Sequence, residues 1–173
     1  MKPKFLVFMA FLIILGCTAN DVRFERLDTR YYEYPTQRMT GNTLTVVPPA
    51  PDLSVELNAE KFRPEKGEVY YNLIVEYSSN EWLFIQRGES LILTVDGEQI
   101  GFRGEGSSPH RETSRGGRIT EKAWYTISFE RLQQIANAER VRVRILGSQR
   151  HIDRSFSERN FENFRHFITK YGI

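Results

Sequence analysis

The sequence predicts a mainly β, α+β protein: an antiparallel β-sandwich or partly open barrel with one short helix and a C-terminal helix. Three observations lead to this fold class. Apolar and polar residues alternate in most segments between Leu53 and Ile145, the dipeptide Asp96–Gly97 is typical of a hairpin turn, and the C-terminal segment carries an aromatic stripe at helical spacing. The chain has 173 residues, of which 40% are hydrophobic and 27% charged, so one soluble domain is expected.

The chain begins with the pattern of an export signal. Lys2 and Lys4 precede an uninterrupted apolar run from Phe5 to Leu15. As a helix this run rises about 16 Å, whereas the hydrocarbon core of a membrane is about 30 Å thick. We therefore expect a signal peptide over residues 1–16 rather than a transmembrane helix.

The end of this signal carries a further motif. Ile14, Leu15, Gly16 and Cys17 resemble the lipobox of bacterial lipoproteins. The resemblance implies cleavage before Cys17, acylation of this cysteine with fatty acids such as palmitate, and anchoring of the protein to a membrane through the lipid. Thr18 in place of Asp resembles lipoproteins that reach the periplasmic face of the outer membrane in Gram-negative bacteria. The alternative is that Cys17 is a buried thiol.

The charge of the mature chain restricts its partners. The full chain has 24 Lys and Arg against 22 Asp and Glu, and removal of the signal with Lys2 and Lys4 leaves 22 of each. A protein that binds nucleic acid through a basic surface is therefore not expected. The single cysteine also excludes a disulfide within the chain.

The mature part is expected to be a short tether over residues 17–21 followed by one domain over residues 22–173. Pro48 to Pro51 are expected to connect two strands within this domain, because the residues before them are too few to form a core alone. Strands are predicted over residues 53–57, 69–77, 82–86, 91–95, 119–127 and 140–146. The Asp96–Gly97 turn pairs Val95 with Glu98, Leu93 with Ile100, and Leu91 with Phe102.

Two helices follow from their N-caps and apolar faces. Ser128 is expected to cap a short helix. Ser157 is expected to cap a C-terminal helix over residues 158–171, and this helix is expected to pack its aromatic stripe on the sheet. The stripe consists of Phe161, Phe164, Phe167, Ile168 and Tyr171.

The order of these elements resembles a group of known domains. From Tyr77 onward, a Trp-containing strand, a Val-Asp-Gly hairpin, a Gly-rich loop, a capped helix, an Arg/Val strand and a C-terminal helix follow one another. This order resembles that of small β-rich domains of bacterial envelope proteins that have no assigned activity. The resemblance brings no catalytic motif with it.

One long connection and one histidine are the candidate places for enzymatic chemistry. Residues 104–117 form a loop long enough to be either functional or mobile, and His110, Arg111 and Arg115 lie in it. His151 and Asp153, two residues apart, form either an acid–base pair or a solvated surface pair. The histidines show no metal-ligand spacing, so no metal site, cofactor or catalytic residue is predicted.

A row of arginines is the remaining candidate for binding. Arg140, Arg142 and Arg144 alternate with Val141, Val143 and Ile145, so the three guanidinium groups are expected to share the outer face of one strand. This row either contacts anionic lipid or glycan phosphate or is a solvated strand face whose charges are met by neighbouring acids. A second patch, formed by Tyr31, Tyr32 and Tyr34, is either a carbohydrate-stacking surface or ordinary packing.

Two functional hypotheses follow from these features. The leading hypothesis is a lipid-anchored, non-enzymatic envelope protein that acts as a binding or structural module, with an envelope protein or a glycan as its partner. The rival is a small periplasmic enzyme with its site near residues 104–117 and His151. A closed pocket with His110 or His151 beside a carboxylate is expected for the enzyme, and a flatter surface for the module.

Overall fold

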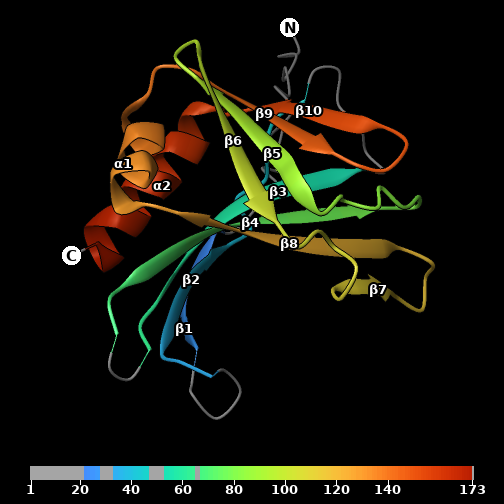
Figure 1. Cartoon of the computed structure of the whole chain (residues 1–173), viewed down its shortest axis with the longest axis horizontal. Helices are drawn as coiled ribbons and strands as arrows, with labels where there is room; N and C mark the ends of the chain where they lie inside the picture. The colour runs from blue at the N-terminus through green and yellow to red at the C-terminus, as the bar shows by residue number, and fades with distance from the viewer. Residues whose placement is uncertain (1–21, 28–32, 47–52, 65–66, 173) are drawn as a thin grey trace, which may run out of the picture.

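The computed structural model describes residues 22–27, 33–46, 53–64 and 67–172 of the chain (Figure 1). The predicted signal peptide, Cys17, the predicted tether, Tyr31, Tyr32 and the predicted connection over Pro48–Pro51 lie outside these residues. In chain order the elements are β1 (Arg23–Leu27), β2 (Thr36–Thr40), β3 (Ser54–Phe62), β4 (Tyr70–Ser79), β5 (Gly88–Val95), β6 (Glu98–Gly104), β7 (Arg111–Thr113), β8 (Ile119–Ile127), α1 (Phe129–Asn137), β9 (Val141–Leu146), β10 (His151–Ser155) and α2 (Glu158–Tyr171).

The strands form one antiparallel sheet, which confirms the predicted mainly β fold class. The strand order is β1-β2-β3-β4-β8-β6-β5-β9-β10, and β7 pairs with the outer part of β8. The hairpin register is also confirmed, because Leu93 lies opposite Ile100 and Leu91 opposite Phe102. The local turn chemistry at Asp96 and Gly97 therefore sets the register of a central strand pair.

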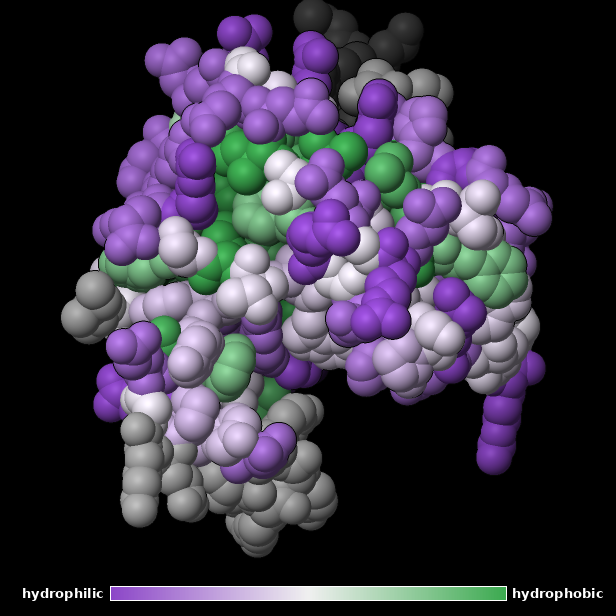
Figure 2. Space-filling view, in the orientation of Figure 1, coloured by the Kyte–Doolittle hydropathy of each residue, from purple (hydrophilic) through white to green (hydrophobic). Residues whose placement is uncertain are grey.

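The sheet curves into a partly open barrel. Residues 42–46 lie between β3 and β10: Thr43 bridges to Glu56, and Thr45 exchanges two backbone hydrogen bonds with Ser155, at 3.0 and 3.1 Å. On the other side, β6 and β8 share a single aligned pair of residues. Figure 1 shows β6 diverging from β8, and Figure 2 shows apolar side chains in the upper centre of this face, framed by hydrophilic ones.

The two helices pack together at one end of the barrel (Figure 1). Both N-caps are as predicted, with Ser128 before α1 and Ser157 before α2, and the bounds of α2 coincide with the predicted 158–171. The aromatic stripe of α2 faces the core, where Phe164 and Phe167 are fully buried, the former against Phe156 and the latter against Tyr171. This packing gives the barrel an apolar core that reaches from the strands to α2.

One predicted strand is wrong. Residues 82–86 alternate like a strand, but they make a single β-bridge, between Ile85 and Gly147, and otherwise form an irregular segment. Phe84 has a φ of 55°, a left-handed conformation that a regular strand does not allow. The physical reason is that the backbone N–H groups of Leu83, Phe84 and Ile85 bond to a side chain of β8 instead of to the backbone of a neighbouring strand. Strands β1, β2 and β7 were not predicted.

Candidate functional site

A buried carboxylate organises the end of the barrel that lies away from the helices (Figure 1). Strand β8 alternates inward and outward residues, and its inward row contains Ile119, Glu121, Ala123, Tyr125 and Ile127. Glu121 is 0% exposed, although its neighbours in this row are apolar or aromatic. Since a buried carboxylate without partners is strongly destabilising, its contacts indicate what it does.

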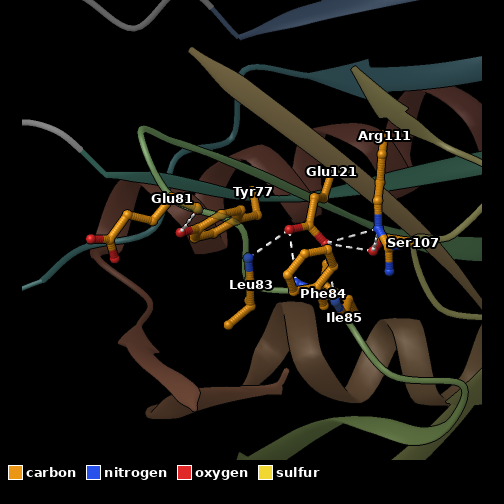
Figure 3. A network of polar contacts seen from close by, with 8 residues as sticks. All are labelled: Tyr77, Glu81, Leu83, Phe84, Ile85, Ser107, Arg111 and Glu121. Atoms are coloured by element: carbon orange, nitrogen blue, oxygen red, sulfur yellow. Dashed lines mark hydrogen bonds and ion pairs between the residues drawn. The ribbon is translucent and has the colours of Figure 1, made fainter. Parts of the chain in front are cut away.

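The Glu121 carboxylate accepts three successive backbone N–H groups (Figure 3). One oxygen accepts from Leu83 at 2.6 Å and Phe84 at 2.8 Å, and the other accepts from Ile85 at 3.0 Å. The second oxygen also accepts from the hydroxyl group of Ser107 and lies 3.8 Å from Nε of Arg111. Hydrogen bonds to an ionised group are the strong ones, so Glu121 fixes residues 83–85 on β8 in place of strand pairing.

Residues 104–117 take part in the same arrangement. Ser107 is fully buried, and its backbone N–H donates to the carbonyl of Ile85 at 3.1 Å. Gly106 has a φ of +73°, and a Cβ added there would lie 2.7 Å from the Ile85 carbonyl oxygen, so only glycine permits this approach. Strand β7 then pairs with β8. The long loop is thus tied to the barrel at Ser107 and at β7.

The segment fixed by Glu121 presents aromatic side chains to solvent. The ring of Phe84 stacks on that of Trp82, with centroids 5.7 Å apart and planes 20° apart. Phe84 is 38% exposed, and Tyr70 is the other large hydrophobic residue exposed in the described part of the chain. A left-handed conformation at a bulky residue costs about 1 to 3 kcal/mol, and such strain is concentrated at binding and active sites.

Charged groups flank these rings on two sides. The guanidinium carbon of Arg111 lies 4.8 Å from the centre of the Phe84 ring, a cation–π arrangement. Arg150 donates to Glu81 and to the hydroxyl group of Tyr77, both at 2.9 Å. A shallow hollow of about 100 Å³ separates this arginine from the rings. We call this region, formed by Glu81, Trp82, Phe84, Arg111 and Arg150, the loop-end surface.

The other residues predicted from the long loop lie elsewhere. His110 packs against Trp124 on the outer face of β8, with ring centroids 4.5 Å apart and planes tilted by 57°, beside a shallow hollow of about 220 Å³. Arg115 is exposed in the turn after β7. The structure therefore brings Arg111 into the loop-end surface and leaves Arg115 outside it.

His151 and Asp153 form a surface pair on β10. Nε2 of His151 lies 3.4 Å from Asp153, and both side chains are 54% exposed. Asp153 also accepts two hydrogen bonds from Arg144, at 2.7 and 3.0 Å, and these hold the pKa of Asp153 below its usual value. The enzymatic hypothesis requires an enclosed histidine–carboxylate pair, and this pair lies on an exposed face instead.

The arginines of the predicted row differ in their partners. Arg142 and Arg144 are exposed on β9, and Arg140 immediately precedes it. Arg144 is paired with Asp153, whereas no acidic partner of Arg142 is found among the described residues. Tyr34 of the predicted tyrosine patch stacks on Phe62, at 6.4 Å. Sequence reasoning missed Glu121 and Trp82–Phe84, although an acid in the inward row of β8 was a signal for the former.

A scan against family models, a search of curated proteins and a search of solved structures each gave no significant match. No helix in the described ranges is long and apolar enough to cross a membrane. Within the same ranges, no three His, Cys, Asp or Glu side chains are grouped to hold a metal ion. The protein is thus a partly open antiparallel barrel with the loop-end surface at one end.

Proposed function

We propose that the protein is a lipid-anchored, non-enzymatic binding module of the bacterial cell envelope, and that the loop-end surface contacts its ligand. The observation that carries the binding role is the use of the buried Glu121 carboxylate. Burying an ion costs several kcal/mol, and here that cost accompanies a strained backbone whose outward side chains are Trp82 and Phe84. An irregular segment that is held rigidly and exposes aromatic rings is typical of a binding surface.

A glycan is the ligand class that best fits this surface. The stacked rings of Trp82 and Phe84 offer apolar faces against which the C–H groups of a sugar ring pack. Arg111, Arg150 and Glu81 surround them with donors and acceptors for sugar hydroxyl groups. Both kinds of contact occur in a shallow, solvent-open region, which suits an extended polymer better than an enclosed small molecule.

The anchor is supported by the lipobox residues and is tested separately. Replacing Cys17 with Ser removes the thiol that accepts the lipid. We expect a labelled fatty-acid analogue to enter the wild-type chain and not the Cys17→Ser chain, which then retains its signal or leaves the membrane fraction. Several acyl chains anchor stably where one does not. Equal incorporation into both chains would contradict the anchor.

The binding role is tested by co-sedimentation of the full chain, in a non-ionic detergent, with purified peptidoglycan. We expect the wild type to sediment with the glycan and the double variant Trp82→Ala/Phe84→Ala to lose most of this binding. Tyr70→Ala is the matched control, because Tyr70 is 42% exposed and lies outside the loop-end surface. Absence of binding by the wild type, or equal losses in the two variants, would contradict the proposal.

A further inference from the structure

A second candidate site lies on the outer face of the barrel, where a groove of about 510 Å³ crosses β5, β9 and β10. Strand register aligns one polar residue from each neighbouring strand along it. Gln99 of β6 lies opposite Thr94 of β5, Thr94 opposite Arg142 of β9, and Arg142 opposite Ser155 of β10. The bridge between Ser155 and Thr45 extends the row by one more hydroxyl-bearing residue. We call these five residues the Arg142 row.

Arg142 lies at the centre of this row, and no acidic side chain of the described residues is paired with it. It is exposed, and neither a hydrogen bond nor an ion pair of its guanidinium group is found within the described ranges. Neighbouring strands are about 4.8 Å apart, so the hydroxyl groups of Thr94 and Ser155 flank it at one strand spacing on each side. Arg142 and these two hydroxyl groups therefore form a cluster of hydrogen-bond donors that includes no negatively charged group.

The adjacent row shows the contrasting case. There, Ile92 lies opposite Arg144 and Arg144 opposite Asp153. Two hydrogen bonds join Arg144 to Asp153, and His151 approaches the same carboxylate. The positive charge of that row is thus already neutralised inside the fold. The two rows share strands and face, and they differ in whether an acid stands opposite the arginine.

We propose that the Arg142 row binds a phosphate group. The planar fork of an arginine donates two parallel hydrogen bonds to a phosphate, and the flanking hydroxyl groups can donate to its remaining oxygens. A free or monoester phosphate offers at least three non-bridging acceptor oxygens to this set, whereas a diester or a carboxylate offers two. Arg140 adds charge from a second hollow, of 210 Å³, that it shares with Thr94 and Arg142. This site stands apart from the loop-end surface and does not depend on its function.

Phosphate in an envelope occurs in free ions, in phosphorylated glycans and in lipid headgroups, and three soluble probes distinguish these sources. The probes are inorganic phosphate, the monoester glycerol 3-phosphate, and the diester glycerophosphoglycerol, each titrated into the full chain in non-ionic detergent at constant ionic strength. The readout is the NMR shift of the arginine Nε–H groups, together with calorimetric titration. Binding of the diester indicates a lipid headgroup, and binding of monoester or free ion alone indicates the other sources.

Two variants and one control test the role of Arg142. We expect Arg142→Gln to weaken phosphate binding about tenfold, because the charge-assisted pair is lost. Asp153→Asn should strengthen binding about twofold to threefold, because it removes a nearby negative charge and frees Arg144. Arg103→Gln is the control, since Arg103 is an exposed residue of β6 outside the row and the change in net charge is the same as in Arg142→Gln. Its binding should stay within about twofold.

The outcomes separate clearly. Saturable binding that Arg142→Gln weakens and Arg103→Gln leaves intact supports the site. No saturable response of the wild type to any of the three probes overturns it, as does equal weakening in Arg142→Gln and Arg103→Gln. Thermal unfolding of all variants identifies loss of fold, which is not expected because Arg142, Asp153 and Arg103 are exposed. Loss of glycan binding by the loop-end surface would leave these results unchanged.

Discussion

Replacement of Glu121 by Gln tests whether one carboxylate holds the end of the barrel. The amide keeps the shape of the side chain but replaces one acceptor oxygen with a donor. If its oxygen continues to accept from Leu83 and Phe84, its NH₂ group faces the N–H of Ile85, which loses its acceptor. In the opposite orientation of the amide, the N–H groups of Leu83 and Phe84 lose their acceptor instead. Either way, at least one buried donor is left without a partner.

The magnitude follows from these contacts. A buried unsatisfied donor costs about 1 to 3 kcal/mol, and each remaining bond loses about 1 kcal/mol on passing from a charged to a neutral acceptor. Arg111 also loses the carboxylate that lies 3.8 Å from its Nε atom. We expect Glu121→Gln to lower the free energy of unfolding by about 3 to 5 kcal/mol, a large share of the 5 to 15 kcal/mol typical of a domain.

Urea unfolding followed by circular dichroism measures this loss, and amide hydrogen exchange locates it. The amides of Leu83, Phe84 and Ile85 should exchange faster in the variant by more than the global change in stability explains. Glu76→Gln is the control: Glu76 is a partly exposed residue of the neighbouring β4 whose ion pair with Lys122 should contribute less than about 1 kcal/mol. A loss below about 1 kcal/mol in Glu121→Gln, or equal losses in the two variants, refutes the reasoning.

Two further predictions concern the core. Phe164→Ala should lower the free energy of unfolding by about 3 to 5 kcal/mol, because the ring is fully buried and packs 5.3 Å from that of Phe156, whereas the exposed Glu162→Ala should change it by less than about 0.5 kcal/mol in the same urea series. Burial raises the pKa of Tyr125 from 10.0 to about 12. The neutral phenol is therefore favoured in the folded state, and its contribution is complete below pH 10 and is lost as the pH rises from 10 to 12, with about 1 kcal/mol lost at pH 11. Tyr125→Phe should lack this component in unfolding curves at pH 8 and 11, and an unchanged pH dependence would contradict the assignment.

Much of the fold was predictable because its determinants are local. The Asp96–Gly97 turn fixes both the conformation and the register of β5 and β6, and three residue pairs follow from counting outward. The C-terminal helix was equally readable, since Ser157 marks its start and aromatic residues mark its buried face. In both cases the residues that decide the structure are neighbours in the sequence.

Residues 82–86 show why part of the candidate site was not predictable. Leu83 and Ile85 are buried, and Trp82 and Phe84 are more exposed, which is the period-two pattern of a strand. Alternation reports which side chains face the core and does not report where the backbone N–H groups go. Here they bond to a carboxylate 36 to 38 residues away in the chain. A clue lay in β8 itself, where Glu121 interrupts an apolar row and a buried acid requires several donors.

The arginine row shows a second limit, because net charge is a property of the whole chain and recognition depends on which charges have partners. Without the predicted signal peptide, which contains Lys2 and Lys4, the chain would have equal numbers of basic and acidic residues, and this argues against a broad basic surface. The fold distributes these charges unevenly: Asp153 pairs with Arg144, and Glu121 approaches Arg111, while no acid stands opposite Arg142. The cross-strand register determines which arginine lies opposite an acid. The alternation of the sequence, with a period of two residues, makes the three arginines look equivalent. A neutral chain therefore still offers a local site for an anion where the register leaves one arginine between hydroxyl groups.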